Sequence, residues 1–228
     1  MKLFQYEHCP YCVRPRLAAA INNINLKIID LVYDDVQTPM NMIGKKLAPI
    51  LQKEDLSFMP ESIDICSYLD ALDGKSIIQS KKANKNFDQL MDKLHYYIRY
   101  LTYPRLYHHP QNKGVFPTDS AISYFKVPKE EKMAIDFDYA LKHSDLYIAD
   151  TENLLSQVMP FFEQRIVDAS NGVSNFLLSY DDIEFFPLLR LLTLAVDVIK
   201  LPEPILIYLE KLSEISKVKL YAPFDYAC

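Results

Sequence analysis

Several features that mark special classes of protein are missing from this sequence of 228 residues. No apolar run approaches the roughly 20 residues that a helix needs to cross a bilayer. The formal net charge of -5 and the absence of a long basic run argue against a general nucleic-acid binder. The chain also has neither an internal repeat nor a low-complexity segment. We therefore expect a globular protein that binds neither membranes nor nucleic acids.

Cysteine is also scarce, with only Cys9, Cys12, Cys66 and Cys228. Four unevenly spaced cysteines are too few for the disulfide framework of a secreted domain. The chain passes from its first two residues straight into a short strand pattern, without the apolar region of a signal peptide. We therefore expect a reducing compartment, the cytoplasm. We interpret Cys66 as a small buried apolar residue and Cys228 as an exposed thiol without a role.

The first 74 residues alternate strand patterns with helical patterns. We predict strands at 3–6, 26–31, 48–52 and 57–59, a helix through 13–21, a short helix with Thr38 as cap and Pro39 as first residue, and a helix that opens at 60–62 and stops at Gly74. A strand, helix and strand in succession favour a parallel pair of strands with a right-handed crossover. The last two strands are close enough in sequence to form a hairpin.

The rest of the chain has only helical patterns, with apolar residues at a period of 3.6. We predict a polar linker at 75–86 and an all-helical domain over 87–228. One long helical pattern covers 130–166, with an interruption near its proline. The segment Ser179-Tyr180-Asp181-Asp182 has the spacing of a capping box and predicts a helix start. We expect the tail from Tyr221 to be loosely packed.

Cys9 and Cys12 stand three residues apart where the first strand gives way to the first helix. At the N-cap, before a proline that needs no N–H, Cys9 would face the free N–H groups of the helix start. Arg14 and Arg16 add positive charge nearby. Such surroundings lower a thiol pKa from about 8.5 to about 3.5–7.5. We therefore predict a redox dithiol in which Cys9 is the nucleophile and Cys12 the resolving thiol.

A thiol of low pKa is a good leaving group, so this pair suits thiol-disulfide exchange. The alternative is that both cysteines are zinc ligands, but zinc needs about four ligands, and no second cysteine pair or matching histidine pair follows. Pro15 is a complication, since a proline inside a helix removes an N–H and predicts a kink or local widening.

Four segments of the chain match the motifs of a known family. They are Tyr6-Glu7-His8-Cys9-Pro10-Tyr11-Cys12, Pro49-Ile50-Leu51-Gln52-Lys53, Met59-Pro60-Glu61-Ser62 and Phe186-Pro187-Leu188-Leu189-Arg190. Cys-Pro-Tyr-Cys after a first strand matches the glutaredoxin active-site motif, and Ala48-Pro49 before a strand resembles the cis-proline site of the thioredoxin fold. Over essentially its whole length, the chain resembles bacterial glutaredoxins of the glutaredoxin-2 type.

The resemblance implies an α/β thioredoxin-like domain over 1–74 with a four-stranded mixed sheet, followed by the linker and the all-α domain, in a glutathione-transferase-like architecture. It implies glutathione as co-substrate, with no metal. The backbone of Ala48 before a cis Pro49 would bind the cysteinyl part of glutathione, and Glu61 and Ser62 would bind the γ-glutamyl part. The glycyl carboxylate would be bound by Lys45, Lys46 or Arg14, a choice that the sequence leaves open.

The function implied is a glutathione-dependent thiol-disulfide oxidoreductase that reduces disulfide-bonded and glutathionylated proteins. Two alternatives remain open. A glutathione transferase would need a single serine, tyrosine or cysteine to stabilise the thiolate of bound glutathione, and the second cysteine, Cys12, weighs against it. A non-catalytic interaction module with the same fold would have no use for a dithiol at a helix start.

Overall fold

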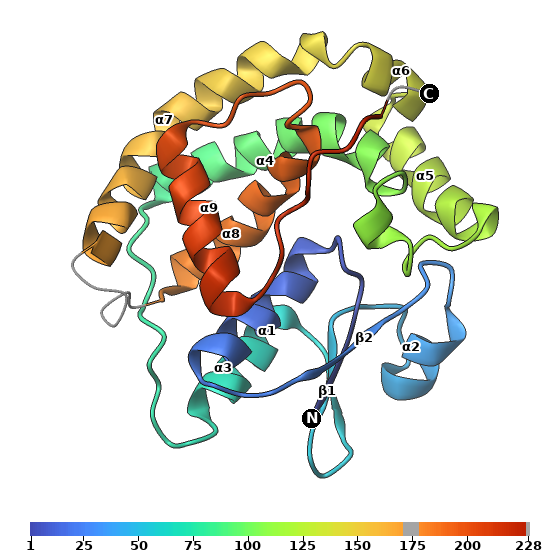
Figure 1. Cartoon of the computed structure of the whole chain (residues 1–228). Helices are drawn as coiled ribbons and strands as arrows, with labels where there is room; N and C mark the ends of the chain where they lie inside the picture. The colour runs from blue at the N-terminus through green and yellow to red at the C-terminus, as the bar shows by residue number, and fades with distance from the viewer. Residues whose placement is uncertain (171–177, 227–228) are drawn as a thin grey trace.

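A four-stranded sheet lies at the N-terminal end of the chain, in the order β2-β1-β3-β4 (Figure 1). The computed structural model describes the backbone of residues 1–170 and 178–226 and the side chains outside 167–170. The strands are β1 (Lys2–Gln5), β2 (Lys27–Asp30), β3 (Ile50–Gln52) and β4 (Phe58–Met59). β2 pairs parallel with β1, whereas β3 pairs antiparallel with both β1 and β4. The predicted mixed sheet, its parallel pair and its hairpin are confirmed.

Three helices accompany the sheet: α1 (Pro10–Ile21), α2 (Gln37–Ile43) and α3 (Ser62–Ala71). α2 begins earlier than predicted, with Val36 as N-cap, so the assignment of Thr38 as cap and Pro39 as first residue was wrong. The Asp35 carboxylate accepts the Thr38 N–H at 2.9 Å, and this acidic side chain satisfies a free N–H of the first turn. Gly44, with a φ of 70°, ends α2.

The remainder of the described chain is helical. Its helices are α4 (Lys85–Leu106), α5 (Asp119–Met133), α6 (Phe137–Lys142), α7 (Asp145–Ser170), α8 (Tyr180–Leu192) and α9 (Glu203–Ser216), with short 3-10 turns at Pro110–Asn112 and Thr193–Ala195. Among these helices, none is both long and apolar enough to span a membrane.

The long helical pattern over 130–166 proves to be three helices rather than one. Ala134 adopts a left-handed conformation with a φ of 52° and ends α5. The Asp136 side chain then accepts the Tyr139 N–H at 2.7 Å and starts α6. The predicted interruption at Pro160 does not occur, because α7 continues through it. Tertiary packing therefore overrides the helix-breaking tendency of this proline.

Residues 75–84 connect α3 to α4 and are held by carboxylates at both ends. The Asp70 side chain of α3 accepts two backbone N–H groups at the start of this segment, and Asp181 of α8 accepts two at its end. The Asn84 side chain then caps α4. The connector is thus fixed to the helix that follows the capping box.

α8 lies at the centre of the helical part, where it contacts α1, α4 and α9. Its predicted capping box of Ser179 and Asp182 is confirmed. Asp182 is fully buried and also pairs with Arg165 of α7 and accepts the Tyr208 hydroxyl at 3.1 Å. Since α1 contacts α8 and α9 as well as α3, one apolar core continues from the sheet into the helices.

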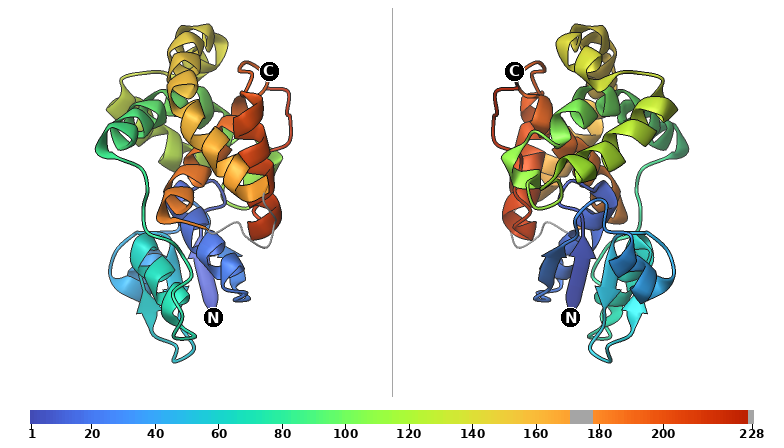
Figure 2. Two further views of the ribbon diagram at one scale, coloured as in Figure 1. Left: turned by 90° about the vertical axis from the view of Figure 1, so that its left-hand side faces the viewer. Right: turned by 90° about the vertical axis from the view of Figure 1, so that its right-hand side faces the viewer.

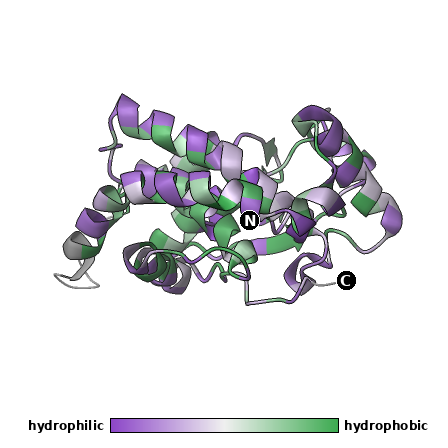
Figure 3. Ribbon diagram, turned by 90° about the horizontal axis from the view of Figure 1, so that it is seen from above, coloured by the Kyte–Doolittle hydropathy of each residue, from purple (hydrophilic) through white to green (hydrophobic). Residues whose placement is uncertain are grey.

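The helices stack above the sheet in both side views (Figure 2), and hydrophobic and hydrophilic residues alternate along them (Figure 3), as in helices with one buried face. The prediction that the tail from Tyr221 is loosely packed was wrong. Tyr221 and Tyr226 are only 3% and 6% exposed, and the Tyr221 hydroxyl donates to Asn112 at 3.3 Å. Cys66 is buried, as predicted, and Cys228 lies outside the described residues.

Candidate active site

Cys9 lies in the turn between β1 and α1, and three backbone hydrogen bonds fix its main chain. Its N–H donates to the Tyr6 carbonyl at 3.0 Å, and its carbonyl accepts the N–H groups of Cys12 and Val13 at 3.0 and 3.2 Å. Cys9 is the N-cap of α1 and Pro10 the first helical residue, as predicted. Cys9 is partly exposed, Cys12 is completely buried, and both are free thiols.

The surroundings of Cys9 favour its thiolate. A hydrogen bond from the Cys12 thiol is the main cause that lowers the pKa of Cys9, and burial opposes it. The backbone N–H groups of Cys12 and Tyr11 and the charge of Arg14 lower this pKa further. The predicted effect of the helix start is therefore present, but the second thiol contributes more.

Cys12 behaves in the opposite way. Burial raises its pKa well above the ordinary value, and the hydrogen bond to Cys9 and the negative charge of the Cys9 thiolate raise it further. The Tyr6 N–H, 3.5 Å from the Cys12 sulfur, lowers this pKa only in part. Of the two thiols, Cys9 therefore loses its proton more readily, and Cys12 keeps its proton more tightly.

The two arginines of α1 both add positive charge near the cysteine pair, as predicted, but they act on different thiols, because the charge of Arg16 lowers the pKa of Cys12. Arg14 lowers the pKa of Cys9, while Arg16 forms an ion pair with Glu7 at 2.8 Å. Glu7 also pairs with Arg190 of α8 at 2.5 Å, and Arg190 donates to the Glu7 carbonyl at 3.1 Å. This ion-pair network fixes the loop before Cys9 to the helical part of the molecule.

The other predicted site residues lie beside this loop. The peptide bond between Ala48 and Pro49 is cis, as the resemblance implied. Because Phe4 of β1 pairs with Ile50 of β3 in an antiparallel register, the residues before β3 lie next to the segment that leads to Cys9. Pro49 is buried and Ala48 half-buried.

Glu61 and Ser62 form the start of α3, which packs against α1. Arg14 donates to the Ser62 hydroxyl at 3.4 Å, so the two helix starts lie side by side. Glu61 is exposed and has a φ of 69°, a conformation that costs a residue other than glycine about 1–3 kcal/mol and that is concentrated at functional sites. The backbone strain at Glu61 is a signal that the sequence could not give.

Sequence reasoning missed an aromatic cluster that holds the loop before Cys9. Its members are Tyr6, His8, Tyr33, Phe116 and Phe125. The His8 ring lies 5.1 Å from the Phe116 ring and 5.5 Å from the Phe125 ring. Burial, with the charges of Lys129 and Arg190, lowers the pKa of His8 to about 3. His8 is therefore a neutral, packed ring at neutral pH.

Two lysines bind to Tyr33 of this cluster. The ammonium group of Lys46 donates to the Tyr33 carbonyl at 2.7 Å, and that of Lys129 donates to the Tyr33 hydroxyl at 2.8 Å. Within the described residues, neither lysine has a carboxylate within ion-pair distance. Burial lowers the pKa of both, that of Lys129 to about 8. The sequence offered Lys46 as one candidate for binding the glycyl carboxylate, but nothing in it pointed to Lys129 or to Tyr33.

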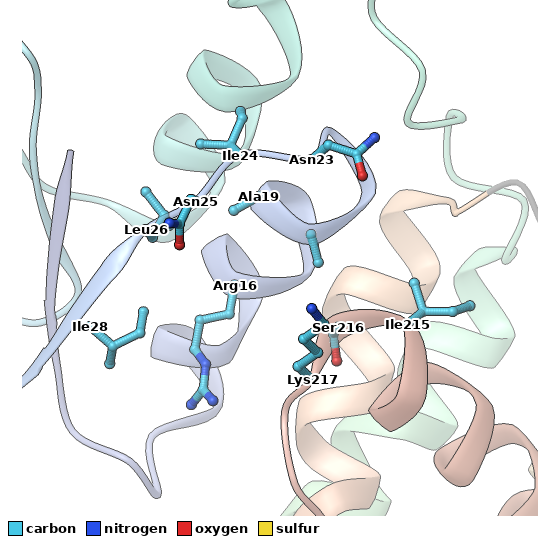
Figure 4. A pocket seen from close by; sticks show the side chains of 11 residues that line it. Arg16, Ala19, Asn23, Ile24, Asn25, Leu26, Ile28, Ile215, Ser216 and Lys217 are labelled. Carbon is cyan, nitrogen blue, oxygen red and sulfur yellow. The ribbon is translucent and has the colours of Figure 1, made fainter.

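A cavity of about 290 Å³ lies between α1 and α4. Tyr11 and Arg14 line it on the side of the cysteine motif, and Asp92 and His95 line it on the side of α4. A second cavity, of about 560 Å³, lies between the C-terminal half of α1 and the end of α9 (Figure 4). None of the predicted site residues lines the second cavity. In the part of the chain that the structure describes, no three metal-ligating side chains gather together.

The comparisons with known proteins identify the family of the chain. A family model described as the C-terminal domain of glutaredoxin 2 matches residues 86–224, and one for the N-terminal domain of glutathione S-transferases matches 3–76. Glutaredoxin 2 of Escherichia coli strain K12 is 36% identical over 96% of this chain and 97% of its own. The chain belongs to the glutaredoxin 2 family.

Solved structures with a similar fold cover nearly the whole chain. Glutaredoxin 2 from Salmonella typhimurium, solved in complex with glutathione, has a TM-score of 0.78 at 35% identity and covers 96% of this chain and 95% of its own. A glutathione transferase from Phanerochaete chrysosporium has a TM-score of 0.65 at 12% identity, covering 97% and 98%, which shows the fold alone. The predicted glutathione-transferase-like architecture is confirmed.

As a glutaredoxin 2 homologue, the chain is a glutathione-dependent oxidoreductase of the glutaredoxin type. The division into 1–74, a linker at 75–86 and a domain at 87–228 stays a prediction, although α4 begins at Lys85. The roles of the individual site residues are likewise a proposal, which the geometry described above supports.

Proposed function

We propose that the chain reduces disulfide-bonded and glutathionylated proteins through Cys9 and Cys12, with glutathione as the reductant. One observation carries this proposal: the structure holds two free thiols with opposite pKa shifts, a lowered one at the partly exposed Cys9 and a raised one at the buried Cys12. An attacking thiolate with a protonated neighbour in reserve is the arrangement that dithiol exchange needs.

Reduction of a protein disulfide takes two exchange steps. The Cys9 thiolate attacks one sulfur of the substrate, which forms a mixed disulfide and releases the other sulfur as a thiolate. Cys9 then carries no charge, so two of the causes that raise the pKa of Cys12, its hydrogen bond to Cys9 and the thiolate charge, disappear. Cys12 can now lose its proton and attack the Cys9 sulfur. The second substrate thiol leaves, and a Cys9–Cys12 disulfide remains.

Two molecules of glutathione then restore the dithiol. The first attacks the Cys9 sulfur and releases Cys12, and the second attacks the glutathione sulfur of the mixed disulfide and releases Cys9. Two electrons pass to the enzyme, and oxidised glutathione leaves. A glutathionylated protein enters this sequence at the mixed disulfide, because Cys9 attacks its glutathione sulfur and the protein thiolate leaves. That reaction needs Cys9 alone.

Glutathione would lie between the Ala48-Pro49 segment and the start of α3. The Ala48 N–H and carbonyl would pair with the cysteinyl backbone of glutathione, as one strand pairs with another. The γ-glutamyl carboxylate would bind Ser62 and the free N–H groups of the helix start, and Glu61 would accept from the γ-glutamyl ammonium group. The hydrogen bond from Arg14 to Ser62 brings a positive charge beside Ser62, and this charge would favour a carboxylate there.

We also propose the cytoplasm as the compartment, because thiols such as these persist in their free form where glutathione keeps the surroundings reducing. The presence of Cys12 argues against a transferase, which stabilises the thiolate of glutathione and does not exchange disulfides with it.

The decisive experiment is to treat the reduced full chain with oxidised glutathione and to map the adducts on its peptides by mass spectrometry. We expect glutathione on Cys9 at early times, followed by a Cys9–Cys12 disulfide. In the Cys12→Ser variant, the Cys9 adduct should accumulate. A first adduct on Cys66 or Cys228, with Cys9 unmodified, would contradict the proposal.

A further inference from the structure

Lys129 belongs to α5, far from the cysteine motif in sequence, yet it contacts the rings that hold the loop before Cys9. Its ammonium group lies 4.2 Å from the centre of the Phe125 ring, and the His8 ring packs on the same Phe125. Its hydrogen bond to the Tyr33 hydroxyl, at 2.8 Å, holds it in this position. Lys129 therefore lies on the same cluster as the residue that precedes Cys9.

The charge of Lys129 has no carboxylate to balance it among the described residues. Burial and the neighbouring charges of Lys46 and Lys132 disfavour its ammonium form, while the Cys9 thiolate favours it. The tyrosine hydroxyls nearby stay neutral, because burial raises the pKa of Tyr33 and Tyr103. The Cys9 thiolate is thus the anion whose charge favours the ammonium form of Lys129.

We infer that Lys129 is a positioning residue for the thiol chemistry: its ammonium group, held by the Tyr33 hydroxyl, stabilises the Cys9 thiolate across the contact between the helical part and the sheet. The inference deepens the proposed function and rests on it, because it concerns the same thiolate. It adds a contribution from the helical part to those of Cys12, the helix-start N–H groups and Arg14.

An attraction of this kind has a measurable consequence. When the cation is removed, the thiolate loses a favourable interaction and the neutral thiol does not, so the pKa of Cys9 rises. Because Lys129 and Cys9 are both partly exposed, we expect a rise of about half a unit to one unit. Below the pKa, the fraction of thiolate then falls about three- to tenfold.

The test compares the full chain with three variants: Lys129→Met, Lys129→Arg and the matched control Lys126→Met. Lys126 is on the same helix, but its charge pairs with Asp138 at 3.0 Å. The rate at which iodoacetamide alkylates Cys9 is followed from pH 4 to 10 by peptide mass spectrometry. We expect the midpoint to rise in Lys129→Met, to return most of the way in Lys129→Arg and to stay unchanged in Lys126→Met.

An unchanged midpoint in a folded Lys129→Met variant would show that Lys129 only packs against the cluster and would overturn the inference, while the proposed function would stand. If iodoacetamide alkylated other cysteines of the unmodified chain but not Cys9, the proposed function would instead be overturned. If Lys129→Met does not fold, Tyr33→Phe provides the measurement, since it removes only the hydroxyl that holds Lys129. A smaller rise in the midpoint is then expected, and no rise would again overturn the inference.

Discussion

The charged side chains around Cys9 differ from those in the rest of the interior. Away from the site, the buried arginines Arg165 and Arg105 are paired with Asp182 and Asp197. Near Cys9, the cations of Arg14, Lys46 and Lys129 have no carboxylate within ion-pair distance among the described residues. A buried charge without a partner is costly.

We interpret the difference as a division between charges that support the fold and charges that support chemistry. A carboxylate beside the site cations would neutralise them and would repel the Cys9 thiolate. Cations without a carboxylate partner can stabilise another anion. The candidates are the Cys9 thiolate and a carboxylate of bound glutathione. Paired ions elsewhere in the core can be judged by their effect on stability alone. The predictions below test this contrast.

The largest effect is expected at the thiolate itself. Cys9→Ser replaces a readily ionised thiol with a hydroxyl, so exchange should fall by at least about 10³-fold. Cys12→Ser should lose reduction of protein disulfides and keep reduction of glutathionylated proteins. Both activities are measured in an assay coupled to glutathione reductase. Full activity of the Cys9 variant would show that the cations serve some other anion.

Substitutions that break ion pairs away from Cys9 should lower the stability of the fold rather than the reactivity of the thiol. Asp182→Asn keeps an acceptor for the capping box but breaks the buried ion pair with Arg165, and we expect a loss of about 3–5 kcal/mol in the free energy of unfolding. Urea denaturation measures this loss. Lys81→Met, which breaks exposed ion pairs with Asp88 and Glu184, should cost less than about 1 kcal/mol.

The Cys12 thiol should prove a stronger contributor to the low pKa of Cys9 than any single cation, since its hydrogen bond is the largest cause of that lowering. Cys12→Ala removes the hydrogen-bond donor, and we expect the alkylation midpoint of Cys9 to rise by about one unit or more. Cys12→Ser keeps a donor of similar geometry and should rise much less. Equal midpoints in the two variants would mean that the hydrogen bond does not stabilise the thiolate.

The last prediction concerns His8, which the aromatic cluster keeps neutral. Its pKa is about 3 in the folded chain and about 6.5 in the unfolded chain. Below pH 6.5 the unfolded chain therefore takes up a proton that the folded chain does not, and stability falls by about 1.4 kcal/mol for each unit of pH down to about 3. Thermal unfolding of His8→Phe from pH 7 to 4 should show a shallower loss than the unmodified chain. If both chains lost stability with the same dependence on pH, the titrating group would not be His8.

Much of the sheet and of the cysteine site was predictable from the sequence, because both depend on neighbouring residues. Cys9 as N-cap, Pro10 at the first helical position and the capping box of Ser179 and Asp182 need only a few consecutive residues. The errors arose where an interaction from elsewhere in the chain decides the outcome. Pro160 lies inside an uninterrupted helix, and Tyr221, expected in a loose tail, is buried and bonded to Asn112.

By itself, the sequence determined which two sulfurs are brought together and which helix start they share, since a motif of four residues sets that geometry. Only the tertiary structure decided the charge around them, because it buries Cys12 and brings Lys129 to Tyr33 from almost a hundred residues away. The physical reason is that a pKa depends on burial and on every nearby charge, and both are set by packing rather than by order along the chain.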